Sequence, residues 1–108
     1  MENKEFNEIV VARMGQVRST LLAKADEYAR GDRLSNFKQI AGLLNCIPEQ
    51  ALIGLVSKHI IALVDFINDK ANDRAQPYAR WDEKIGDIIA YMILLDAMVQ
   101  EKPPTETP

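Results

Sequence analysis

The stretch WDEKIGDIIAYMILLDAM, residues 81–98, decides the fold that we expect of this chain. Its apolar residues recur at steps of three and four, which is the period of an amphipathic helix: Ile85, Ile88, Met92 and Leu95. Three carboxylates, Asp82, Glu83 and Asp87, stand at the head of the same stretch. We therefore expect a last helix over residues 81–101 that is broadly apolar and acidic at its N-terminal end.

The residues before this stretch predict three more helices. The pattern indicates a long first helix over residues 4–30, a short second one with Ser35 as its N-cap, and a third that Pro48 opens. The third is apolar around most of its circumference over residues 51–67, which is typical of a helix buried on several sides. Residues 72–79 form a polar connection, and no strand alternation is visible. The fold class is therefore all-α, a four-helix bundle.

The length of 108 residues fits one domain, which we assign to residues 1–102. The tail, residues 103–108, is rich in proline and polar residues and is expected to be disordered. Helices with such wide apolar faces expose more apolar surface than one subunit can cover. Identical subunits are the usual partners for such faces, so we expect a homodimer or higher oligomer.

Composition excludes several classes of function. A net charge of -3 makes nucleic acid an unlikely partner, because phosphate-backbone binding needs clustered Lys and Arg. The single cysteine, Cys46, excludes an intrachain disulfide and a cysteine-based zinc site. The N-terminus lacks the apolar core of a signal peptide, and no run approaches the ~20 apolar residues of a membrane span. These features predict a cytoplasmic protein with no membrane partner.

Four carboxylates are the candidate metal ligands. On the third helix, Asp65 and Asp69 share a face with Lys58, and on the fourth Glu83 and Asp87 share a face with Tyr91. Two helices joined by a short loop normally pack antiparallel, which would bring these acids together at one end of the bundle. Oxygen-only ligands suit Mg²⁺ or Mn²⁺, which can hold a phosphate chain and orient a water for attack.

Each candidate also has a plain structural interpretation. Acidic pairs four residues apart are common on solvated helix faces, and acids at a helix N-terminus favour the helix dipole. His59 is more simply a hydrogen-bonded core histidine, and Cys46 a small buried residue. Four polar residues between the first two helices have two equally open interpretations, to bind a phosphate or only to form the turn between the helices: Asp32, Arg33, Asn36 and Lys38.

The order of three segments resembles small phage and prophage proteins of the MazG-like kind, relatives of the all-α nucleotide pyrophosphohydrolases. These segments are KADEYARGDRLSNF, IPEQALIGLVSKHIIALVDFIND and DEKIGDIIAYMILLDAM, and the resemblance covers residues 18–100. The family motif is a Glu-x-x-Glu pair on one helix and a Glu-x-x-Asp pair on the next. Asp87 matches the final Asp, Glu83 is one residue early, and Asp65 and Asp69 are four residues apart.

The resemblance implies a Mg²⁺-dependent nucleoside triphosphate pyrophosphohydrolase, or a nucleotide-binding relative of it. In that case Asp65, Asp69, Glu83 and Asp87 would coordinate the metal. The substrate would be held by a second set of residues: Arg33, Asn36, Lys58 and Tyr91. The alternative is a non-catalytic helical phage accessory protein that acts through protein–protein contacts.

Overall fold

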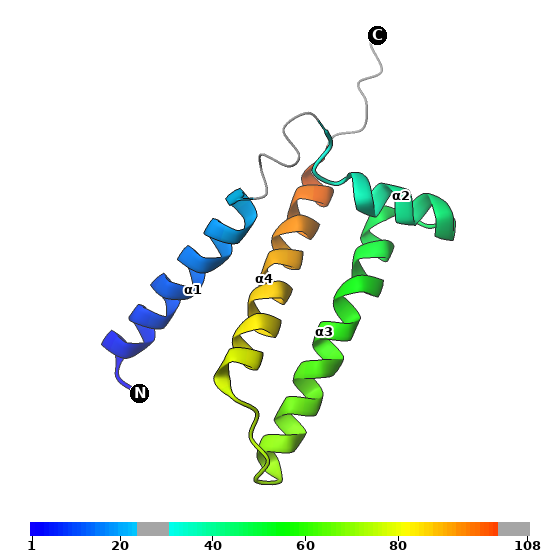
Figure 1. The fold of residues 1–108 in the computed structure, drawn as a ribbon. Coiled ribbons are helices and arrows are strands. Elements are labelled where there is room, and N and C mark those ends of the chain that lie inside the picture. Colours follow the sequence, from blue (N-terminus) through cyan, green and yellow to red (C-terminus); the bar gives the residue numbers. More distant parts are fainter. Residues whose placement is uncertain (24–30, 102–108) are drawn as a thin grey trace.

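The computed structural model describes residues 1–23 and 31–101, where all the regular structure is helical (Figure 1). The helices are α1 (Asn3–Ala23), α2 (Ser35–Leu44), α3 (Pro48–Ala71) and α4 (Tyr78–Gln100). The predicted all-α class is confirmed, and the last helix begins slightly earlier than expected. The extension of the first helix over residues 24–30 and the disordered tail over residues 103–108 lie outside the described residues.

The start of α2 differs from the prediction. Ser35 is not the N-cap, because it is already the first helical residue, and Leu34 precedes it without a side-chain cap. Instead, the Leu34 N–H donates a hydrogen bond to Asp32 Oδ1 at 2.9 Å. An aspartate that bonds the backbone two residues ahead closes the turn in the way a cap would have done.

α2 ends at Leu44, with Asn45 as its C-cap. Asn45 has a positive φ of 55°, and the Cys46 N–H donates to the Ala41 carbonyl at 2.9 Å. Asparagine tolerates this left-handed conformation better than most residues, so it ends the helix. Cys46 itself is half-buried, so its expected burial is only partial.

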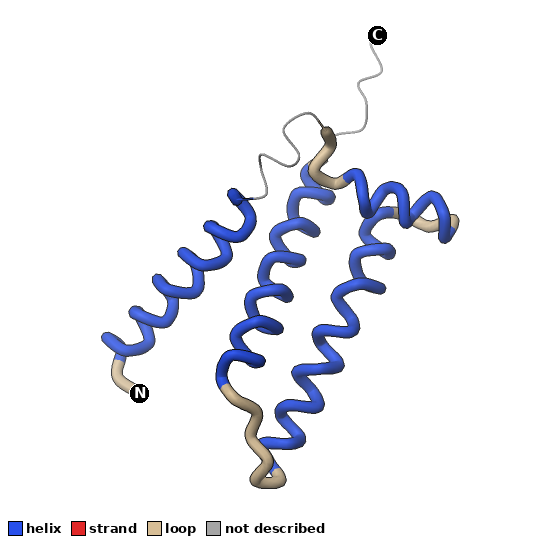
Figure 2. The backbone as a smooth tube through the Cα atoms, in the orientation of Figure 1, coloured by secondary structure: helices blue, strands red, loops and turns tan. Residues whose placement is uncertain are grey.

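The helices lie mostly in one layer. α3 and α4 run antiparallel side by side, α1 lies along the other side of α4, and α2 crosses the N-terminal end of α3 (Figures 1 and 2). α3 can begin at Pro48 because the first helical position needs no backbone N–H, and the Ile47 N–H before it donates to Gln50 Oε1 at 3.1 Å. Because α1 and α3 lie on opposite sides of α4, the described residues of one chain do not close the three long helices into a bundle (Figure 1).

The hydrophobic core is small and sits where α2, α3 and α4 meet. Leu52 and Val56 of α3 are fully buried there. They pack with three further buried side chains: Leu34, Phe37 and Met98. Because this core anchors α2 to the top of the α3–α4 pair, it fixes the position of the α2 side chains that face the helix pair.

The contact of α1 with α4 combines a buried apolar side chain with several polar contacts. Val17 is the only buried residue of α1, whereas Arg13 bridges to α4 through an ion pair with Asp82 Oδ1 at 2.6 Å. Gly86 permits the approach, because a Cβ there would lie 3.1 Å from Arg13 Nη1 and from Gln16 Oε1. The glycine in the opening stretch is thus explained by a side-chain contact from α1.

Candidate functional site

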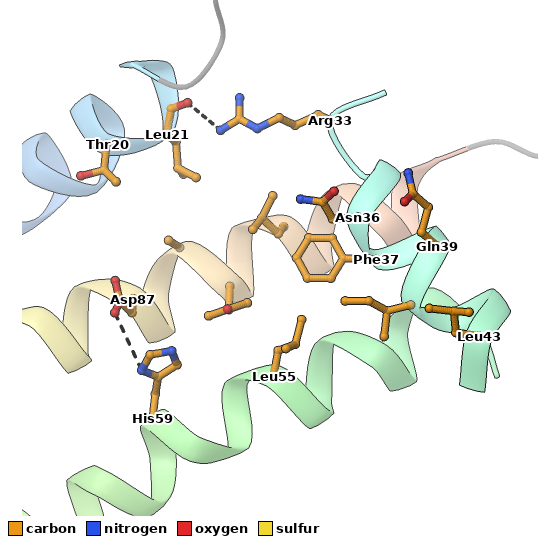
Figure 3. Close-up of a pocket in the computed structure, with 14 residues that line it drawn as sticks. Thr20, Leu21, Arg33, Asn36, Phe37, Gln39, Leu43, Leu55, His59 and Asp87 are labelled. Atoms are coloured by element: carbon orange, nitrogen blue, oxygen red, sulfur yellow. Dashed lines mark hydrogen bonds and ion pairs between the residues drawn. The ribbon is translucent and has the colours of Figure 1, made fainter. Parts of the chain in front are cut away.

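A cavity opens between α2, α3, α4 and the C-terminal end of α1 (Figure 3). Its volume of about 530 Å³ falls within the range of small-molecule pockets. The wall is apolar for the most part, with the polar side chains Thr20, Arg33, Asn36, Gln39, His59, Asp87 and Tyr91 among its lining residues. A pocket that combines aliphatic and aromatic walls with several polar groups suits a ligand with one apolar and one polar part.

His59 and Asp87 form the polar wall between α3 and α4. His59 is only 9% exposed, and its Nδ1 lies 3.8 Å from Asp87 Oδ2. This nitrogen is buried and has no hydrogen-bond partner. Figure 3 shows it directed at Asp87, with the other ring nitrogen facing the interior of the pocket. His59 is therefore buried as expected, but the expected hydrogen bond is missing.

Aromatic rings line the pocket beside this pair. The Tyr91 ring lies 5.6 Å from the His59 ring and 6.3 Å from the Phe37 ring, with an edge-on angle of 79° to Phe37. Edge-to-face contacts of this kind restrict ring motion and are worth about 0.5–1.5 kcal/mol beyond area burial. The three rings come from α2, α3 and α4, so the packing of those helices holds this wall in place.

Arg33 and Asn36 lie on the α2 side of the cavity. The Arg33 guanidinium spans from the turn before α2 to α1, where Nη2 donates to the Leu21 carbonyl at 2.8 Å. Figure 3 shows Asn36 between Arg33 and the Phe37 ring. Arg33 therefore places a guanidinium group, with its several N–H donors, at this rim.

The rest of the polar group near α2 is engaged in ion pairs away from the cavity. Lys38 bonds both Asp32 and Glu101, and so links the turn before α2 to the end of α4. The hydrogen bond from Lys38, together with the one from the Leu34 N–H, holds the pKa of Asp32 below its usual range. Hydrogen bonds to Asp32 and Glu101 raise the pKa of Lys38. For Asp32 and Lys38, shaping the turn is the interpretation that the structure supports.

The four candidate metal ligands are not brought together within one chain. Asp65 and Glu83 are exposed, and Asp69 is engaged at the α3–α4 turn, where it accepts a hydrogen bond from Gln76 Nε2 at 2.9 Å. Lys58 is also exposed and does not line the cavity. Across residues 1–23 and 31–101, no three His, Cys, Asp or Glu side chains are placed to hold a metal ion.

The physical reason is the position of each carboxylate along the two paired helices. Asp69 lies at the α3–α4 turn beside Gln76 and Arg74, whose Nη2 lies 3.9 Å from Asp69 Oδ1. Asp87 lies opposite His59. His59 precedes Asp69 by ten residues on α3, which is about 15 Å along the helix at 1.5 Å per residue. The antiparallel pairing was correctly expected, but it sets these two carboxylates against different neighbours.

A scan against family models and searches of curated proteins and of solved structures found no match for this chain. The site therefore rests on its own geometry. That geometry places His59, which the sequence indicated as a core histidine, in the cavity wall, and it joins Arg33, Asn36, Asp87 and Tyr91 in the same cavity.

Proposed function

We propose that this protein binds a small phosphorylated ligand of the nucleotide class in the cavity between α2, α3 and α4. One observation carries the proposal: three of the four expected substrate-binding residues, Arg33, Asn36 and Tyr91, line a single cavity. Arg33 and Asn36 lie around the start of α2, whereas Tyr91 lies in the distant α4, so the meeting of these two segments is a property of the fold. The proposal assigns Lys58, which is exposed elsewhere on α3, no role in the pocket.

The two ends of the cavity offer different chemistry to such a ligand. The rings of Phe37 and Tyr91 give an aromatic base a surface for edge or face contacts. Arg33 places a guanidinium at the rim, and its charge attracts phosphate while it keeps its bond to the Leu21 carbonyl. The base would lie inward and the phosphates toward the rim.

Metal-dependent hydrolysis is the finer form of this proposal. The described residues of one chain do not fit a Mg²⁺ or Mn²⁺ site built from Asp65, Asp69, Glu83 and Asp87, because these side chains do not gather. Among the described residues that line the cavity, Asp87 is the one carboxylate. A Mg²⁺ ion that arrives on a triphosphate often takes only one or two protein carboxylates. Release of pyrophosphate from a bound triphosphate is the measurement that tests pyrophosphohydrolase activity.

Titration of a panel of nucleoside mono-, di- and triphosphates, with and without Mg²⁺, tests the proposal by calorimetry. Tyr91→Ala should weaken binding at least tenfold, because it removes the aromatic wall. Asp65→Asn is the matched control, since Asp65 is exposed outside the cavity. If no nucleotide binds at millimolar concentration, or if the Asp65 variant weakens binding as much as Tyr91→Ala, the proposal is wrong. Measuring pyrophosphate release in the same samples separates binding from hydrolysis.

The alternative, a helical accessory protein that acts through protein contacts, has its own supporting observation. Large apolar side chains are exposed on every helix, among them Val11 at 73%, Leu43 at 86% and Ile61 at 61%. Exposed apolar surface on this scale usually marks an interaction site. A protein that binds no nucleotide but loses a partner when these residues are made polar would favour the alternative.

A further inference from the structure

The exposed side of α3 carries a regular apolar stripe. Its members are about half exposed: Ile53 at 51%, Ile60 at 45%, Val64 at 50% and Ile67 at 57%. With Ser57 included, the positions follow one another at steps of four, three, four and three, which is the spacing of a coiled-coil seam. The stripe is separate from the side of α3 that packs in the core through Leu52 and Val56.

The shape of the chain leaves this stripe uncovered. The radius of gyration is 17.2 Å, whereas a compact domain of this length has about 13 Å. α4 lies along one side of α3, and α2 covers only its N-terminal end (Figure 1). The middle of α3 therefore has an apolar surface that no described segment of the same chain covers.

We propose that a second copy of this chain covers the stripe, with the two α3 helices antiparallel about a two-fold axis beside Ile60. In this register Ile60 meets its own copy, and Ile53 meets the second copy's Ile67. Ser57 falls opposite Val64, so that a small residue faces a larger one and the two seams interdigitate. The stripe is complementary to itself when reversed, as an isologous interface requires.

Charge supports the antiparallel register. Glu49 lies in the first turn of α3 and Lys70 in the last. If the spacing of the stripe is continued in both directions, Gln50 and Ala71 are the next seam positions. Glu49 and Lys70 each lie one residue before these positions, so both occupy the same flank of the stripe. In an antiparallel pair like flanks face each other, which sets each Glu49 beside a Lys70 of the other copy. Neither residue has an ion-pair partner in the part of the chain that the structure describes.

A lipid bilayer is the competing occupant. α3 is long and apolar enough to cross a membrane by length and composition alone, but the core helix of a soluble protein also passes that test. Lys58 and Asp65 are exposed near the middle of α3. Charged side chains at that depth would be costly in a bilayer, whereas they lie outside the seam of a helix pair.

Cross-linking measures the register directly. In a Cys46→Ser background, Ile60→Cys should link to its own copy through a short bis-maleimide. Ile53→Cys alone should not, because its two copies would be about 21 Å apart along the pair at 1.5 Å per residue. A mixture of Ile53→Cys and Ile67→Cys chains should link to each other. Val11→Cys on α1, which is 73% exposed, is the control for chance encounters.

The outcomes divide clearly. If Ile53→Cys links to its own copy, the pair is parallel and the proposal is wrong. If Val11→Cys links as efficiently as Ile60→Cys, the links come from random collision and the proposal is also wrong. Sedimentation should show a dimer that Ile60→Asp weakens at least 100-fold while Val11→Asp does not. A wild-type monomer at 100 μM, or flotation of the wild type with phosphatidylcholine vesicles, would also overturn it. Nucleotide titrations of the Ile60→Asp variant report on the pocket independently.

Discussion

Replacing His59 with leucine should make the protein more stable and weaken its ligand binding. His59 is 9% exposed, and its Nδ1 is buried without a hydrogen-bond partner. Leucine has a similar size and no polar atom, so it fills the space without leaving a nitrogen unsatisfied. The neighbouring Asp87 side chain is 44% exposed and keeps its access to water when the imidazole is gone.

The expected gain follows from two opposing effects. A buried polar group without a partner costs about 1–3 kcal/mol, which the substitution removes. The ring contact with Tyr91, at 5.6 Å between centroids, is lost with the imidazole. Such a contact is worth about 0.5–1.5 kcal/mol. The net gain is therefore about 1 kcal/mol, or roughly 4 °C in melting temperature for a domain of this size.

Urea denaturation at pH 7 and one fixed protein concentration measures this gain, because self-association would otherwise change the apparent stability. His59→Gln is the matched control: it keeps a polar group in the same position and should show no gain. Both variants should bind nucleotide more weakly than the wild type. If His59→Leu is less stable than the wild type by ~1 kcal/mol or more, the imidazole is paired with Asp87 in the folded protein and the reasoning is wrong.

Three further predictions address other contacts. Lys38→Met should destabilise the protein near neutral pH. The lowered pKa of Asp32 gives stability that is present above about pH 4 and is lost as pH falls through the folded pKa. The raised pKa of Lys38 gives stability that is lost only as pH rises through its folded pKa. Melting curves of both proteins should therefore converge at the two pH extremes; a constant difference would contradict this. Arg13→Ala should speed amide exchange throughout α1 while leaving α3 unchanged, because Arg13 supplies most of the polar contact with α4; equal changes in both helices would count against it. Asp87→Asn should reduce any Mg²⁺-induced rise in melting temperature, and an undiminished rise would exclude Asp87 as a ligand.

The sequence by itself determined the helices. Three-four spacing of apolar residues, Pro48 at a helix start and the polar residues after α3 are local signals, so the all-α class and the approximate bounds of α2, α3 and α4 followed from them. The cap of α2 was misassigned, because Asp32 and Ser35 are both good cap residues and a small change in the turn decides between them.

Only the tertiary structure decided which polar side chains meet. Residue spacing places Asp69 and Asp87 on faces of their own helices, but it does not show which residues of the other helix lie opposite them. That alignment comes with the packing of Phe37, Leu52 and Met98 in the core. In the folded chain Asp87 lies beside His59, whereas Asp69 joins the α3–α4 turn. His59 looked like a core residue because its sequence neighbours are apolar; the missing partner of its Nδ1 becomes visible only when α4 is in place.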